Sequence, residues 1–204
     1  MVKKYVFITL VVLVVAAAFV IYADKHGVIR TSGEDIGVSA GQAILINGEN
    51  GKVMYEKCAD EKAYPASTTK IMTALITLEV LRENDSPMDQ EIEVPECAQG
   101  VEGSSIYLKS GEKISIEDLL YGLMLVSGND AATALAEIIG GTQENFVEMM
   151  NEKAKSLGCK NTHFANPSGL FDEEHYTTAR DMAIISMEAM KDPTFRKIVG
   201  TTSR

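Results

Sequence analysis

The fold is decided by one stretch of the sequence, PASTTKIMTALITLEVL, which spans residues 65–81. Its apolar side chains cover nearly the whole circumference of a helix, whereas a helix at a protein surface is apolar on one side only. The pattern predicts a helix from Ser67 to Leu81 that is buried on most sides and central to its domain. Ser67 and Lys70, three residues apart, would share one face at its start.

Ser67 and Lys70 are residue types that together perform nucleophilic catalysis. A serine hydroxyl is a weak nucleophile until a base takes its proton, and a lysine one turn along is such a base once burial lowers its pKa. A drop from about 10.4 to about 7 or 8 costs roughly 3 to 5 kcal/mol, which desolvation in a buried helix supplies. Backbone N–H groups at the helix start would stabilise a developing oxyanion.

A second Ser-x-x-Lys occurs at Ser110 to Lys113. It lies in a polar stretch and contains Gly111, so no helix would fix the two side chains relative to each other. We expect a tight turn there and no catalytic role.

The tripeptide Ser127-Gly128-Asn129 is another candidate element. It follows the apolar run from Leu119 to Val126 and precedes a helix expected over residues 129–139, so it lies at a break between two helices. A hydroxyl and a carboxamide at such a junction would relay a proton and hold a substrate amide. The alternative is a C-capping glycine beside an N-capping asparagine, with no chemical role.

Together these residues resemble the exported serine D-alanyl-D-alanine carboxypeptidases, which are low-molecular-mass penicillin-binding proteins. The similarity extends from about residue 38 to the end of the chain. The resemblance implies an α/β (α+β) fold of the β-lactamase/transpeptidase type, with an antiparallel sheet beside a helical region and the active site between them. The further matching motifs are AILI (43–46), GKV (51–53), SGNDA (127–131), NTHFANP (161–167) and GL (169–170).

The resemblance also implies a reaction. These enzymes remove the terminal D-alanine from the pentapeptide stem of peptidoglycan through an acyl-enzyme, and β-lactam antibiotics inhibit them. Ser67 would be the nucleophile and Lys70 its base. Ser127 would relay a proton between Lys70 and the leaving amine, and Asn129 would bind the peptide carbonyl. The partners implied are the stem peptide and β-lactams, and no cofactor or metal is expected.

One family motif, K-[TS]-G, is not found after Ser127, and Lys109-Ser110-Gly111 comes before it. In the family this motif lies on an edge strand that pairs with the substrate. A lone hairpin of short apolar strands is also only marginally stable. We therefore expect residues 42–204 to be an incomplete catalytic domain whose last strands follow Arg204.

The N-terminus has the features of an export signal. Lys3 and Lys4 precede an uncharged run that ends at Ala23, so residues 1–23 are expected to be a signal peptide, or a membrane anchor if uncleaved. Residues 24–41, rich in Gly, Ser and charge, are expected to be a linker. The remainder would work outside the cytoplasm, at the cell wall or membrane.

Local signals predict the other elements. Residues 43–46 and 53–55 flank Asn50-Gly51, a pair that tolerates the positive φ of a hairpin turn. Two later segments, 91–94 and 105–108, are too short to complete a sheet. Helices near 116–126, 142–157 and 178–191 are predicted from the capping hydroxyls of Ser115, Thr142 and Thr178.

Composition excludes several function classes. The formal net charge of −10 disfavours nucleic-acid binding, which depends on clustered Lys and Arg. The three histidines show no paired metal spacing. Three cysteines, Cys58, Cys97 and Cys159, form neither a disulfide-dense scaffold nor a zinc ribbon, and we expect them to be small buried residues.

Two other functions stay open at this point. A class A-like β-lactamase shares Ser-x-x-Lys but needs a glutamate that holds a deacylating water, and Asn166-Pro167-Ser168-Gly169 occupies the region where one would look. A non-catalytic, membrane-tethered wall-binding module would explain the missing third motif. Asp130 and His175 are further proton acceptors, expected to be a first-turn acid of a helix and a loop residue.

Overall fold

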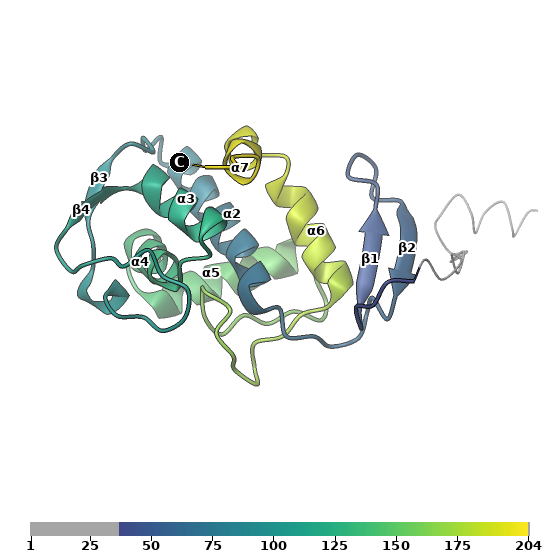
Figure 1. The fold of residues 1–204 in the computed structure, drawn as a ribbon. Coiled ribbons are helices and arrows are strands. Elements are labelled where there is room, and N and C mark those ends of the chain that lie inside the picture. The colour runs from purple at the N-terminus through teal and green to yellow at the C-terminus, as the bar shows by residue number, and fades with distance from the viewer. Residues whose placement is uncertain (1–36, 204) are drawn as a thin grey trace, which may run out of the picture. The chain divides into compact units, whose positions relative to one another are not determined.

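The computed structural model describes residues 37–203, which fall into two compact units divided after Lys57 (Figure 1). The expected signal segment, residues 1–23, and most of the expected linker lie outside the described residues. Within residues 37–203, no helix is both long and apolar enough to cross a bilayer.

The first unit contains the predicted antiparallel hairpin, formed by β1 (Ala43–Ile46) and β2 (Val53–Lys57). Its turn is held by Asn47, whose carbonyl accepts from the amide of Gly51 and whose side chain accepts from those of Glu49 and Asn50. Of the Asn-Gly pair, only Gly51 takes a positive φ, +70°.

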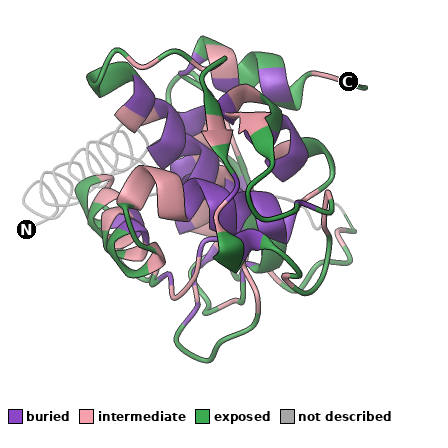
Figure 2. Ribbon diagram, turned by 90° about the vertical axis from the view of Figure 1, so that its left-hand side faces the viewer, coloured by how far each residue is buried: buried purple, intermediate pink, exposed green. Residues whose placement is uncertain are grey.

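The second unit is built around α2 (Lys70–Glu83), which confirms the predicted buried central helix. A 3-10 turn, η1 (Ala66–Thr69), leads into α2, so the α-helix begins at Lys70 and Ser67 lies in the turn before it. Every later helix packs against α2, and their buried faces meet around it (Figures 1 and 2). These helices are α3 (Ile116–Leu125), α4 (Asn129–Gly140), α5 (Gln143–Ser156), α6 (Ala179–Ala189) and α7 (Pro193–Val199).

The predicted capping residues begin three of these helices. Ser115, Thr142 and Thr178 each accept, through the side-chain oxygen, from the amide three residues later. The helix α7 was not predicted, although Asp192 caps it and Pro193 occupies its first turn. That combination is a local start signal, because an acid accepts from free amides and proline has no N–H to lose.

A second small antiparallel sheet joins β3 (Glu91–Glu93) to β4 (Lys113–Ser115). The first strand falls in one of the two weak segments noted in the sequence. The other segment, residues 105–108, forms a loop. A short 3-10 turn, η2 (Glu96–Ala98), follows β3 in the sequence and contacts α4.

The prediction that all three cysteines are buried is wrong. Cys58 and Cys97 are exposed, and Cys159 is half-buried. Composition alone could not show this, because a small side chain in a loop carries no periodic signal. Among residues 37–203, no three His, Cys, Asp or Glu side chains are grouped so that they could hold a metal ion.

Candidate active site

The amine of Lys70 is the centre of a polar cluster inside the second unit. Lys70 begins α2 and is 2% exposed, whereas Ser67, one turn earlier, is exposed. The Nζ atom of Lys70 lies 3.1 Å from Ser67 Oγ, 2.7 Å from Asn129 Oδ1 and 2.7 Å from the carbonyl oxygen of Ser168. The cluster thus places a buried amine beneath a hydroxyl that solvent and substrate can reach.

Burial lowers the pKa of Lys70 from its ordinary value of 10.5 to about 8. The cause is desolvation, since an ammonium loses its hydration shell when it is enclosed. A base with a pKa near the working pH combines an available lone pair with enough basicity to take a proton.

The three neighbours of the amine fix the direction of its lone pair. The oxygens of Asn129 and Ser168 only accept hydrogen bonds, so they take the two N–H groups of a neutral amine. The third direction points to Ser67 Oγ, a hydroxyl that can donate its proton. In the neutral form, Lys70 therefore meets Ser67 as an acceptor.

Asn129 reaches this cluster from the start of α4. Its amide donates to the carbonyl of Ser104, and its Nδ2 donates to the carbonyl of Glu102 at 2.7 Å. These bonds orient the carboxamide so that Oδ1 faces Lys70. The approach is tight, because a Cβ added to Gly103 would lie 2.6 Å from Asn129 Nδ2.

Ser127 lies two residues before Asn129, between α3 and α4. It adopts a left-handed conformation with φ +62°, which is rare for a residue with a side chain. Its Oγ is buried and has no hydrogen-bond partner within residues 37–203. A buried hydroxyl without a partner is costly to stability, so Ser127 is a group whose hydrogen-bonding capacity is unused.

Ser168 is a participant that sequence reasoning missed. It contributes its backbone carbonyl, which no side-chain pattern reveals. The loop that carries it is shaped by Asn166, whose Oδ1 accepts from the amides of Ser168 and Gly169 and whose Nδ2 donates to the carbonyl of Leu170. The sequence Asn166-Pro167-Ser168-Gly169 could have indicated a turn here, since Asn and Gly favour turns in which a side chain accepts from the backbone.

This loop is pressed against the turn that carries Ser67. Gly169 has φ +85°, and a Cβ at this position would lie 1.9 Å from the carbonyl oxygen of Ala66. Ala66 itself has φ +47°. For a residue with a side chain such as Ala66, this left-handed conformation is sparsely populated; it persists only where the surroundings enforce it, and such residues are concentrated at functional sites.

Asp130 holds the loop of residues 105–108 in place next to Asn129 and does not serve as a base. Its carboxylate accepts from the hydroxyl of Ser105 and the amides of Ile106 and Leu108. Burial opposes its ionisation, but these hydrogen bonds prevail and hold the pKa of Asp130 below its ordinary value of 3.8. As a first-turn acid of α4 it matches the expectation, and it also anchors the loop next to Asn129.

The second Ser-x-x-Lys plays no part in this cluster. Ser110 and Lys113 are exposed, with Gly111 at φ +78° in the turn before β4, as predicted.

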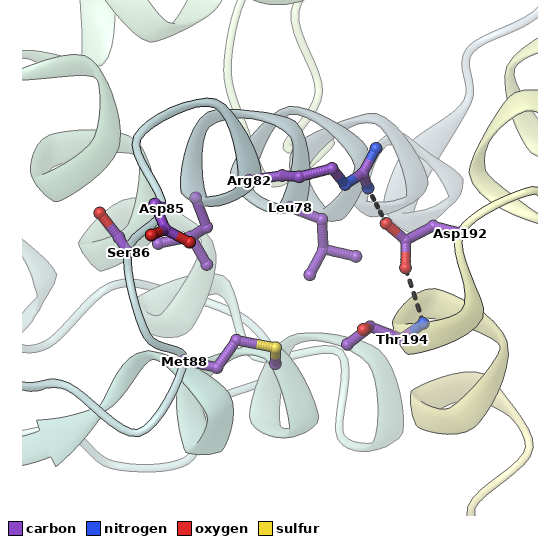
Figure 3. A pocket seen from close by; sticks show the side chains of 8 residues that line it. Leu78, Arg82, Asp85, Ser86, Met88, Asp192 and Thr194 are labelled. Atoms are coloured by element: carbon purple, nitrogen blue, oxygen red, sulfur yellow. Dashed lines mark hydrogen bonds and ion pairs between the residues drawn. The ribbon is translucent and has the colours of Figure 1, made fainter.

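A hollow of about 220 Å³ lies elsewhere in the second unit, at the C-terminal end of α2 (Figure 3). The ion pair of Arg82 with Asp192 forms part of its wall, and Asp192 also caps α7. None of the candidate catalytic residues lines it.

Comparison with known proteins gives consistent matches over most of the chain. Residues 29–204 match the family model of D-alanyl-D-alanine carboxypeptidase. The D-alanyl-D-alanine carboxypeptidase DacF of Bacillus subtilis is 44% identical over 172 residues, which are 84% of this chain and 44% of that protein. DacC of Escherichia coli is 39% identical over 161 residues, covering 76% of this chain and 40% of that protein.

Solved structures agree. D-alanyl-D-alanine carboxypeptidase DacD from Francisella tularensis matches with a TM-score of 0.79 and 38% identity, over 85% of this chain and 43% of that one. Penicillin binding protein 5 from Haemophilus influenzae matches with a TM-score of 0.76 and 37% identity, over 79% of this chain and 48% of that one. The chain thus spans less than half the length of these four relatives. The matches confirm the expected α+β fold.

Proposed function

The chain belongs to the D-alanyl-D-alanine carboxypeptidase family, and on that premise we propose that its protein removes the terminal D-alanine from peptidoglycan pentapeptide stems through an acyl-enzyme. The observation that carries this proposal is the enclosed amine of Lys70, 3.1 Å from Ser67 Oγ, with its two other hydrogen-bonding directions occupied by acceptors.

In this proposal the neutral amine of Lys70 takes the proton of Ser67 as Oγ attacks the carbonyl carbon of the penultimate D-alanine. The C–N bond to the terminal D-alanine breaks, and the departing nitrogen gains a proton. An ester to Ser67 remains, and water then hydrolyses it to free the shortened stem and the serine.

Ser127 is proposed to pass the proton from Lys70 to the leaving nitrogen. Its support is the buried hydroxyl that lacks a partner within the described residues and lies two positions from Asn129. A hydroxyl donates and accepts at once, which a relay requires.

Asn129 is proposed to bind the peptide carbonyl of the substrate. Its Nδ2 donates to the carbonyl of Glu102 in this structure. Because an amide nitrogen carries two N–H groups, one remains for a substrate carbonyl. β-Lactams are proposed to acylate Ser67 as well. Because peptidoglycan lies outside the cytoplasm, the protein is proposed to be exported and to act at the cell wall.

The direct test measures D-alanine released from an N-acetylated pentapeptide ending in D-alanyl-D-alanine, using the complete gene product that contains this chain. Release that requires Ser67 supports the proposal. Rapid repeated turnover of a chromogenic β-lactam, without a stable adduct, would instead indicate the β-lactamase alternative. No D-alanine release and no adduct would indicate a non-catalytic wall-binding module.

A further inference from the structure

A buried pair, Thr69 and His175, connects the two segments that surround Lys70. Thr69 immediately precedes Lys70 and is 0% exposed, and His175 is 1% exposed. His175 Nε2 lies 2.8 Å from Thr69 Oγ1, and its Nδ1 lies 3.0 Å from the amide nitrogen of Ala165. One imidazole therefore spans from the turn that carries Ser67 to the chain that leads to Ser168.

The backbone determines which ring nitrogen carries the proton. The amide of Ala165 can only donate, so Nδ1 is the acceptor and Nε2–H donates to Thr69 Oγ1. Burial lowers the pKa of His175 to about 4, against the opposing charge of Asp172 and with the charge of His163 adding to the effect of burial. The ring is accordingly neutral near pH 7 and keeps this hydrogen-bond pattern.

The chain around His175 is held on both sides. Tyr176 exchanges two backbone hydrogen bonds with His163, and Thr177 exchanges two with Ala63. The imidazole also packs edge-on against Phe164, with 5.6 Å between ring centroids. Residues 175–177 thus lie between the stretch that leads to Ser67 and the stretch that leads to Ser168.

We infer that His175, acting through Thr69, is a positioning residue that sets the placement of the Ser168 carbonyl relative to Ser67 and Lys70. This inference rests on the proposed function and assigns a role to two residues beyond the four named for it. The loop of residues 166–170 is also tied to α2 by the hydrogen bond from Thr73 Oγ1 to the Pro167 carbonyl, at 2.6 Å, and the link through His175 fixes the chain that enters this loop. A displacement of about 1 Å at a reacting centre costs about 10²-fold in rate.

The test uses matched variants of the complete gene product. His175→Phe keeps the aromatic packing and removes both nitrogens, and Thr69→Val removes the hydroxyl with little change of shape. We expect each to lower the second-order rate constant for acylation by fluorescent penicillin by about 10- to 100-fold. The double variant should fall no further than the slower single variant, since both break one link.

His175→Gln is the rescue variant, because its side-chain amide offers an N–H group toward Thr69 Oγ1. It should recover most of the acylation rate that His175→Phe loses. If folded His175→Phe reacts at the wild-type rate, or the two single losses multiply in the double variant, the inference is overturned. Should His175→Phe not fold, the test compares Thr69→Val, which should lose acylation rate, with His175→Gln, which should keep most of it.

A second readout is independent of activity. Amide hydrogen exchange of residues 165–170, followed by mass spectrometry, should accelerate in His175→Phe or Thr69→Val while α3 exchanges as in the wild type. Unchanged exchange over residues 165–170 overturns the link. If wild-type protein forms no adduct, the proposed function fails, and the exchange measurement alone decides the inference.

Discussion

The amine of Lys70 lies 2.7 Å from the carbonyl oxygen of Ser168, a residue 98 positions further along the chain. This contact makes the basicity of Lys70 depend on a loop whose shape Asn166 sets and whose fit Gly169 permits. Together with Asn129, the loop encloses the amine and turns its lone pair toward Ser67.

The first prediction concerns the base. Lys70→Arg keeps the positive charge, but a guanidinium cannot become neutral near pH 7. General-base catalysis contributes about 10²- to 10⁴-fold, so the acylation rate with labelled penicillin should fall by that factor. Lys113→Arg, in the exposed second Ser-x-x-Lys, is the matched control and should react like wild type. A loss of only a fewfold in Lys70→Arg would mean that another group takes the proton.

The second prediction concerns the pH dependence of stability. The pKa of Lys70 is 10.5 in an unfolded chain and about 8 in the folded one, so the unfolded state binds more protons between these values. The contribution of Lys70 to the free energy of unfolding should therefore rise from pH 8 to pH 10.5. The free-energy cost of burying the charged amine of Lys70, up to about 3 kcal/mol, applies in full below pH 8 and disappears above pH 10.5.

Lys70→Met isolates this effect, because it removes the titrating group from the same buried site. The difference in the free energy of unfolding between wild type and Lys70→Met should shift in favour of wild type as pH rises from 7 to 10.5, measured by urea unfolding. A difference that stays constant with pH would show that Lys70 is hydrated in the folded protein.

The third prediction concerns the contact of Gly169 with Ala66. Gly169→Ala adds a Cβ that would lie 1.9 Å from the Ala66 carbonyl oxygen, so the loop must shift away from Ala66 and displace the neighbouring Ser168 carbonyl. Both stability in urea and the acylation rate should fall.

Gly158→Ala is the control for this substitution, because Gly158 has a similar φ of +81° but open space around it. It should lose only the roughly 1 to 2 kcal/mol that a left-handed conformation costs a residue with a side chain. Equal stability losses in the two variants would contradict the role given to the close contact.

The central helix and its first residues were predictable because their signal is local. An apolar pattern around the whole circumference predicts burial, and a serine and a lysine three residues apart share a face wherever a helix forms. The capping hydroxyls of Ser115, Thr142 and Thr178 were equally readable, since each acts on an amide three residues away.

Other features lay beyond sequence reasoning for physical reasons. The pairing of β3 with β4 joins two strands of three residues each, and an alternation as short as Glu-Ile-Glu or Lys-Ile-Ser is too brief to indicate a strand. The contribution of Ser168 is a backbone carbonyl, which every residue possesses. His175 lies in a loop, as expected, but its burial was not predictable because it comes from neighbours distant in sequence, Thr69 above all.

The most direct measurement is intact-mass spectrometry of the complete gene product after brief exposure to penicillin, followed by peptide mapping of the adduct. We predict one penicilloyl group per molecule, carried by the peptide that contains Ser67, and none in Ser67→Ala, while Ser110→Ala labels fully. An adduct that persists in Ser67→Ala, or maps to another residue, would contradict Ser67 as the nucleophile.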